Sequence, residues 1–158
     1  MRLFSTLFLV FALMVGCGAV SAQSESFSDI KKWANKFGFD KVDGVTLWEH
    51  PAFVQAMRET LDAAHFETFM SEWSQQVSTM LTLKGDILNT FVCKAHACNS
   101  DNVNIFIDLK QQQAYACWHQ REEGEDYWFA LGKARKAVGP TGCITAYPYE
   151  LFDKYSKE

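Results

Sequence analysis

Four cysteines in the second half of the chain constrain its possible folds more than any other feature. They are Cys93, Cys98, Cys117 and Cys143. An even number of cysteines in an exported chain indicates disulfides, and four cysteines allow three connectivities. We favour Cys93–Cys98 with Cys117–Cys143, because two cysteines that flank a four-residue turn can meet without long-range contacts.

The first 22 residues predict export. Met1 and Arg2 form a minimal basic region, and residues 3–15 are an apolar run of 13 residues. That run is too short to span a bilayer as a helix but is typical of a secretory signal. Small residues follow up to Ala22, so we predict a signal peptide over residues 1–22 and one domain over residues 23–158. In a rival interpretation, Cys17 is lipidated and anchors the chain. No later stretch is apolar for long enough to form a transmembrane span.

The charge of the predicted mature domain limits its partners. The formal net charge is −4 for the whole chain and becomes −5 without Arg2, the one charged residue of the signal segment. An acidic surface argues against nucleic acid and anionic lipid, and favours a cationic protein, mainly by steering the encounter. The sequence leaves open whether the chain forms a homodimer.

Helical periodicity dominates the first half of the domain. Ser28 or Asp29 is suited to cap a short helix that Gly38 ends. Pro51 suits the first position of a second helix, which runs to Leu61. Apolar residues at helical spacing from Phe66 to Val77 predict a third.

After Gly85 the apolar period changes to two, which predicts strands. The predicted strands cover residues 88–93, 103–109, 115–119 and 127–131, with turns at 110–113 and 122–126. Residues 148–155 are suited to a closing helix. Short strands joined by short turns indicate an antiparallel meander. We therefore predict an α+β fold in which N-terminal helices pack on one face of a disulfide-linked antiparallel sheet.

The most informative six residues are Cys93, Lys94, Ala95, His96, Ala97 and Cys98. Closing this small ring would contribute about 2 kcal/mol in the chain-entropy model, against roughly 3.5 kcal/mol for the span from Cys117 to Cys143. The small ring would therefore chiefly fix the shape of a loop that displays Lys94 and His96, as a rigid binding element requires. From spacing alone, a structural turn with an incidental histidine explains the same residues equally well.

This hexapeptide resembles the Cys-Lys-Pro-His-Asp-Cys signature of the Ivy family, the bacterial periplasmic inhibitors of vertebrate-type lysozyme. Weaker similarities extend over residues 46–53, 102–118 and 128–132. The resemblance implies that the loop enters the lysozyme cleft and that His96 reaches the catalytic carboxylates. It implies a lysozyme partner, cationic and of the chicken type, and a periplasmic location.

Two positions depart from the signature. Ala95 stands in place of proline and Ala97 in place of aspartate. The first change frees the loop backbone, and the second removes a side-chain acceptor that could brace the turn. Either change could weaken lysozyme binding or fit the loop to a different target.

Two other functions use the same residues. Cys93, His96 and Cys98, with Cys117 and His119, could bind zinc or copper if the cysteines were thiolates. A cysteine nucleophile would define an enzyme, but no nucleophile motif surrounds Cys93 or Cys98, and a disulfide would silence both. We therefore predict a binding protein with no catalytic residue, no cofactor and no bound metal.

Overall fold

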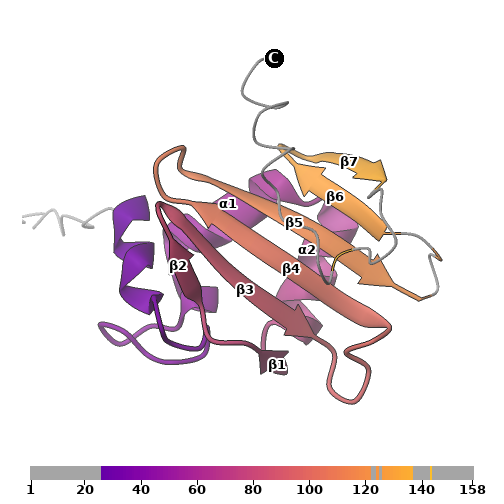
Figure 1. Ribbon diagram of the computed structural model, residues 1–158, viewed down its shortest axis with the longest axis horizontal. Coiled ribbons are helices and arrows are strands. Elements are labelled where there is room, and N and C mark those ends of the chain that lie inside the picture. Colours follow the sequence, from indigo (N-terminus) through magenta and orange to yellow (C-terminus); the bar gives the residue numbers. More distant parts are fainter. Residues whose placement is uncertain (1–25, 122–123, 125, 137–142, 144–158) are drawn as a thin grey trace, which may run out of the picture.

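The computed structural model describes residues 26–121, 124, 126–136 and 143. In these residues, helical segments precede an antiparallel sheet of seven strands. Helices α1 and α2 lie on one face of the sheet (Figure 1). The predicted α+β fold is thus confirmed. The predicted signal peptide and closing helix fall outside the described residues. Within the described part of the chain, no helix is long and apolar enough to cross a membrane.

The helices begin at residues that either satisfy a free N–H group or, as proline does, lack one. The 3-10 helix η1 (Phe27–Trp33) begins after Ser26, so its cap precedes the predicted Ser28 or Asp29. The short 3-10 helix η2 (Leu47–Glu49) has a capping box between Thr46 and Glu49. Helix α1 (Pro51–Thr60) begins with Pro51, as predicted, because proline lacks the N–H that would otherwise be unsatisfied there.

The third predicted helix is shorter than its sequence pattern suggested. Helix α2 (Ala63–Thr68) continues into a π-helical turn, η3 (Phe69–Trp73), and Val77 already belongs to a strand. Asp62 caps α2 by accepting a hydrogen bond from the backbone N–H of His65 at 3.0 Å. Partial burial raises the pKa of Asp62, but hydrogen bonds from the backbone and ring of His65 outweigh it and hold that pKa below its usual value.

The sheet is an antiparallel meander in which two short strands share the outer edge of β3. Strands β3 to β7 are neighbours in chain order, whereas β1 and β2 both pair with β3, β1 at its Cys93 end and β2 at its Ile87 end. The four longer strands match the predicted ones, but β1, β2 and β7 have only two to four residues and were not predicted. The strands are β1 (Val77–Ser78), β2 (Thr82–Lys84), β3 (Ile87–Cys93), β4 (Asp101–Asp108), β5 (Gln113–Gln120), β6 (Asp126–Ala130) and β7 (Lys133–Lys136).

The main core fills the space between the helices and the sheet. Val103, Ile105 and Ile107 of β4 point into it, because alternate residues of a strand share a face. Within this core, the Trp73 ring stacks on the Trp118 ring with centroids 4.1 Å apart. The Thr60 hydroxyl lies 2.8 Å from the Ala114 carbonyl oxygen and ties the end of α1 to β5.

The opposite face of the sheet holds a second, smaller core. Its buried members are Phe106, Tyr115, Cys117, Trp128, Ala130 and Cys143. The Cys117–Cys143 disulfide lies within this cluster, with Cα atoms 5.2 Å apart. The second disulfide therefore fastens residue 143 to the face of the sheet that α1 and α2 leave uncovered.

The contact between Gly38 and Trp48 predicts a strong size limit at position 38. A Cβ atom added to Gly38 would lie 1.9 Å from Cζ2 of Trp48, a ring that also packs against Phe53 and Phe69. Gly38→Ala should lower the free energy of unfolding by about 3 kcal/mol in urea titrations, because the buried ring must move. Gly44→Ala is the control: its Cβ would meet no atom within 4 Å, so only the backbone cost of its positive φ, about 1 kcal/mol, should appear. Equal losses from the two variants would contradict this account.

Candidate binding loop at the end of the sheet

The connection between β3 and β4 projects beyond the end of the sheet, beside β1 (Figure 1). The two strands pair in register up to Cys93 and Asn102, so the loop begins immediately after Cys93. The Cys93–Cys98 disulfide closes the six-residue ring, with Cα atoms 4.9 Å apart. Both disulfides favoured from the sequence are therefore present in the structure.

A tight turn at the tip of the ring displays His96. The Ala97 N–H donates to the Lys94 carbonyl at 3.0 Å and closes the turn. His96 has a φ of 63°, in the left-handed region that few residues other than glycine adopt; histidine is among those enriched there. Lys94, Ala95 and His96 are exposed, whereas Ala97 and Cys98 are half-buried. In the described part of the chain, the His96 ring makes no hydrogen bond or ion pair.

Three polar side chains outside the ring support its backbone. Gln76 Oε1 accepts a hydrogen bond from the Ala95 N–H at 2.6 Å. Asn102 Nδ2 donates to the Cys98 carbonyl at 2.9 Å, and the Ser100 hydroxyl lies 3.2 Å from the Ala97 carbonyl. None of the three was predicted from the sequence. Asn102 and Ser100 are polar residues close to the ring, but Gln76 lies 19 residues before Ala95, and no periodicity signals such a contact.

A row of cross-strand neighbours connects the ring to β6. Cys93 is paired with Asn102, Asn102 with His119, and His119 with Asp126. His119 Nδ1 is hydrogen-bonded to Asp126 Oδ1, and Asp126 Oδ2 accepts from the Cys143 N–H at 2.7 Å. Asp126 was predicted to lie in a turn; instead it is the first residue of β6 and a partner of both His119 and residue 143. His119 itself is on β5, outside the ring.

The disulfides remove the ligands that a metal site would need. Cys93, Cys98 and Cys117 are all oxidised, so none supplies a thiolate to accompany His96 or His119. The described residues contain no group of three or more His, Cys, Asp or Glu side chains that could hold a metal ion. A disulfide sulfur is likewise no nucleophile, so neither alternative function is supported at this loop.

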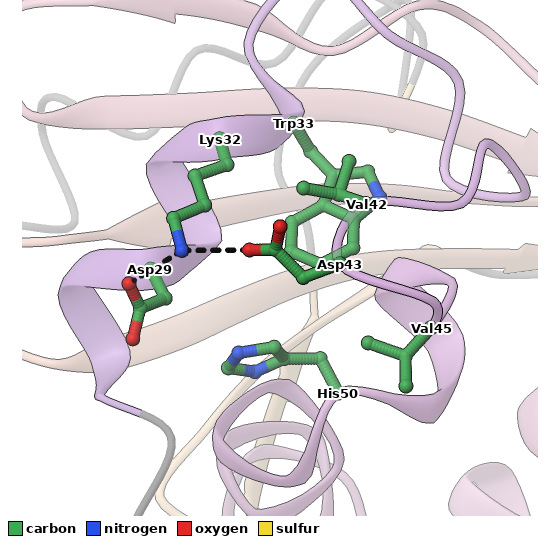
Figure 2. Close-up of a pocket in the computed structure, with 7 residues that line it drawn as sticks. All are labelled: Asp29, Lys32, Trp33, Val42, Asp43, Val45 and His50. Atoms are coloured by element: carbon green, nitrogen blue, oxygen red, sulfur yellow. Dashed lines mark hydrogen bonds and ion pairs between the residues drawn. The ribbon is translucent and has the colours of Figure 1, made fainter.

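A small cavity lies away from the loop, between η1 and the start of α1. Figure 2 shows Asp29, Lys32, Trp33, Val42, Asp43, Val45 and His50 around it. The cavity is only about 50 Å³, well below the several hundred that a small-molecule site usually occupies. Lys32 spans the site, 3.1 Å from Asp29 and 2.8 Å from Asp43. Hydrogen bonds from Lys32, and then from the Ser26 N–H, hold the pKa of Asp29 below its usual value. These groups hold η1 against the following loop.

The fold and the loop define a class of α+β domain that displays a short disulfide-closed loop from the end of an antiparallel sheet. A family model described as Inhibitor of vertebrate lysozyme (Ivy) matches residues 52–141, more than half of the chain. The chain therefore belongs to the Ivy family, and membership implies a lysozyme inhibitor rather than an enzyme. The match contains the whole ring, whereas Cys143 lies beyond it. No curated protein and no solved structure matches the chain.

The two disulfides should differ in their effect on stability. Cys117→Ala with Cys143→Ala should lower the free energy of unfolding by roughly 3.5 kcal/mol, because it opens the longer span within the second core. Cys93→Ala with Cys98→Ala should cost about 2 kcal/mol, because it opens only a six-residue ring. Urea unfolding followed by circular dichroism measures both. A larger loss from the Cys93 and Cys98 pair would contradict the view that the small ring mainly fixes loop shape.

Proposed function

We propose that this protein inhibits a lysozyme by inserting the ring from Cys93 to Cys98 into the active-site cleft, with His96 at its tip. Membership in the Ivy family supports the inhibitory role. The observation that carries the mode of binding is the conformation of His96: its side chain is exposed at a turn that a disulfide closes, beyond the end of the sheet. Because the turn is formed before contact, binding would cost little ordering of the loop.

The chemistry of the target suits an imidazole. Lysozyme holds one glutamic acid protonated by a raised pKa and one nearby aspartate ionised. A neutral imidazole donates a hydrogen bond from one ring nitrogen and accepts one at the other. The His96 ring can therefore accept from the glutamic acid and donate to the aspartate, and so occupy both catalytic groups together.

The net charge of the chain supports a cationic lysozyme as the partner, and its disulfides support the periplasm as the compartment. The net charge of −4 favours encounter with a cationic lysozyme, such as one of the chicken type. Two disulfides require an oxidising compartment, which supports export to the periplasm through the signal segment over residues 1–22. Lipid attachment at Cys17 would instead hold the domain of residues 23–158 at a membrane surface.

The direct test is inhibition of cell-wall lysis. The protein without residues 1–22 is added to chicken-type, goose-type and invertebrate-type lysozymes, and the clearing of a bacterial suspension is followed by turbidity. We expect inhibition of at least the chicken-type enzyme. Undiminished lysis by all three classes would rule out the proposed function.

His96→Asn should weaken inhibition by at least about thirtyfold. A residue at the centre of a desolvated interface typically contributes about 2 kcal/mol or more, and each 1.4 kcal/mol is a factor of ten. Asparagine tolerates a positive φ, so this variant removes the ring while leaving the turn intact. His96→Ala removes the ring too, but adds the backbone cost of a left-handed alanine.

Asn99→Ala is the matched control for His96→Asn, because Asn99 is exposed in the same connection but lies outside the ring. It should inhibit like the parent, as measured by the inhibition constant in the turbidity assay. Equal inhibition constants for His96→Asn and the parent would show that the histidine does not enter the cleft.

Lys94→Ala should have a smaller effect, about threefold or less at moderate salt. Lys94 is exposed, and a solvated ammonium contributes little to affinity but speeds association with an oppositely charged surface. Stopped-flow association rates at rising salt concentration test this. The parent should approach the Lys94→Ala rate as salt screens the charge, and a difference that persists at high salt would contradict the prediction.

A further inference from the structure

One contact ties the ring to a segment far from it in sequence. Gln76 Oε1 accepts from the Ala95 N–H at 2.6 Å, and Gln76 Nε2 donates to the Glu72 carbonyl at 3.0 Å. Exchanging the amide oxygen and nitrogen would set donor against donor at Ala95 and acceptor against acceptor at Glu72. The hydrogen bonds therefore fix one orientation of the Gln76 amide.

The bond acts on the peptide unit that governs the tip of the ring. The Lys94 carbonyl and the Ala95 N–H belong to the same peptide group. Its carbonyl accepts from the Ala97 N–H, and its N–H donates to Gln76. Both sides of this peptide are thus held, whereas the disulfide ties only the two ends of the ring. Rotation of this peptide would reorient the turn and move His96.

Gln76 is itself held by the body of the domain. Its backbone N–H donates to the Trp73 carbonyl at 3.0 Å, and the Trp73 ring stacks on Trp118 in the main core. The next residue, Val77, is the β1 partner of Cys93. The contact therefore joins the turn to both the helical layer and the sheet edge.

We infer that Gln76 is a positioning residue for lysozyme binding: its side-chain oxygen holds the Lys94–Ala95 peptide so that the turn presents His96 in its binding conformation. This inference rests on the proposed function. A loop already in its bound conformation avoids an ordering cost that a mobile loop would incur on binding. A proline at position 95 could not make this bond, because it has no N–H.

A double-mutant cycle tests the inference. Gln76→Ala should weaken inhibition between about threefold and tenfold, the equivalent of one hydrogen bond of net strength near 1 kcal/mol. In the Ala95→Pro background the same substitution should change inhibition less than twofold, because the N–H is already absent. Equal fold-changes in the two backgrounds, or no change in the parent, would overturn the positioning role.

Two further variants separate positioning from a general structural effect. Gln75→Ala removes a neighbouring exposed glutamine that makes no side-chain hydrogen bond in the described residues, and should inhibit like the parent. Gln76→Glu keeps an oxygen for the Ala95 N–H but sets a second oxygen against the Glu72 carbonyl, and should restore part of the inhibition lost in Gln76→Ala. Failure of Gln76→Glu to exceed Gln76→Ala would overturn the assignment to the Ala95 bond.

Hydrogen exchange at Ala95 makes the result independent of lysozyme. In the free protein, NMR should show the Ala95 amide exchanging at least about fivefold faster in Gln76→Ala than in Gln75→Ala. An unchanged exchange rate would overturn the inference even if inhibition fell. Faster exchange with unchanged inhibition would overturn the positioning role as well. A parent protein that inhibits no lysozyme would overturn the proposed function, and the positioning role with it, whatever the exchange rate.

Discussion

The pairing of β3 with β4 is the constraint on which both the core and the loop depend. Its register places Cys93 opposite Asn102 and continues without a bulge to Ile87 opposite Asp108. A slip of one residue would turn Val103, Ile105 and Ile107 away from the helices, at the cost of most of the core that they fill. The same slip would separate Asn102 from the Cys98 carbonyl, so the hydrophobic pattern of the sheet also determines where the ring is held.

The side chains that stabilise the domain and the exposed side chains of the ring lie in different parts of the structure. Trp73, Trp118 and their neighbours are buried on the helical side of the sheet, and the Cys117–Cys143 disulfide fastens the opposite face. The ring lies past the end of both cores, where Lys94 and His96 are exposed. Substitutions at the exposed tip should therefore cost the fold little stability. The polar contacts from Gln76 and Asn102 join the two regions: Gln76 follows the buried Trp73, Asn102 is a buried residue of β4, and both side chains bond to the backbone of the ring.

The elements that could be predicted from the sequence are those in which apolar residues recur regularly over one continuous segment. In the four longer strands, residues of the two faces alternate over at least five positions. Helix α1 begins with Pro51 and has apolar residues at helical spacing. Each of these elements was therefore recognisable from the chain alone. Strands β1, β2 and β7 are too short for an alternating pattern of apolar residues to be recognised. They form by pairing with the outer edges of β3 and β6. The ring was recognisable because its cysteines are five residues apart. Its supports were not, because the Gln76 contact and the His119–Asp126 pair depend on tertiary placement of common polar residues.

We propose that the ring blocks the cleft of lysozyme rather than another part of its surface. Calorimetric titration of a chicken-type lysozyme with this protein, in the presence and absence of a saturating N-acetylglucosamine oligosaccharide, tests it most directly. An oligosaccharide that fills the cleft should compete with the loop, so the apparent affinity should fall in proportion to oligosaccharide occupancy. An affinity that is unchanged when the cleft is filled would contradict the account, because the inhibitor would then bind elsewhere.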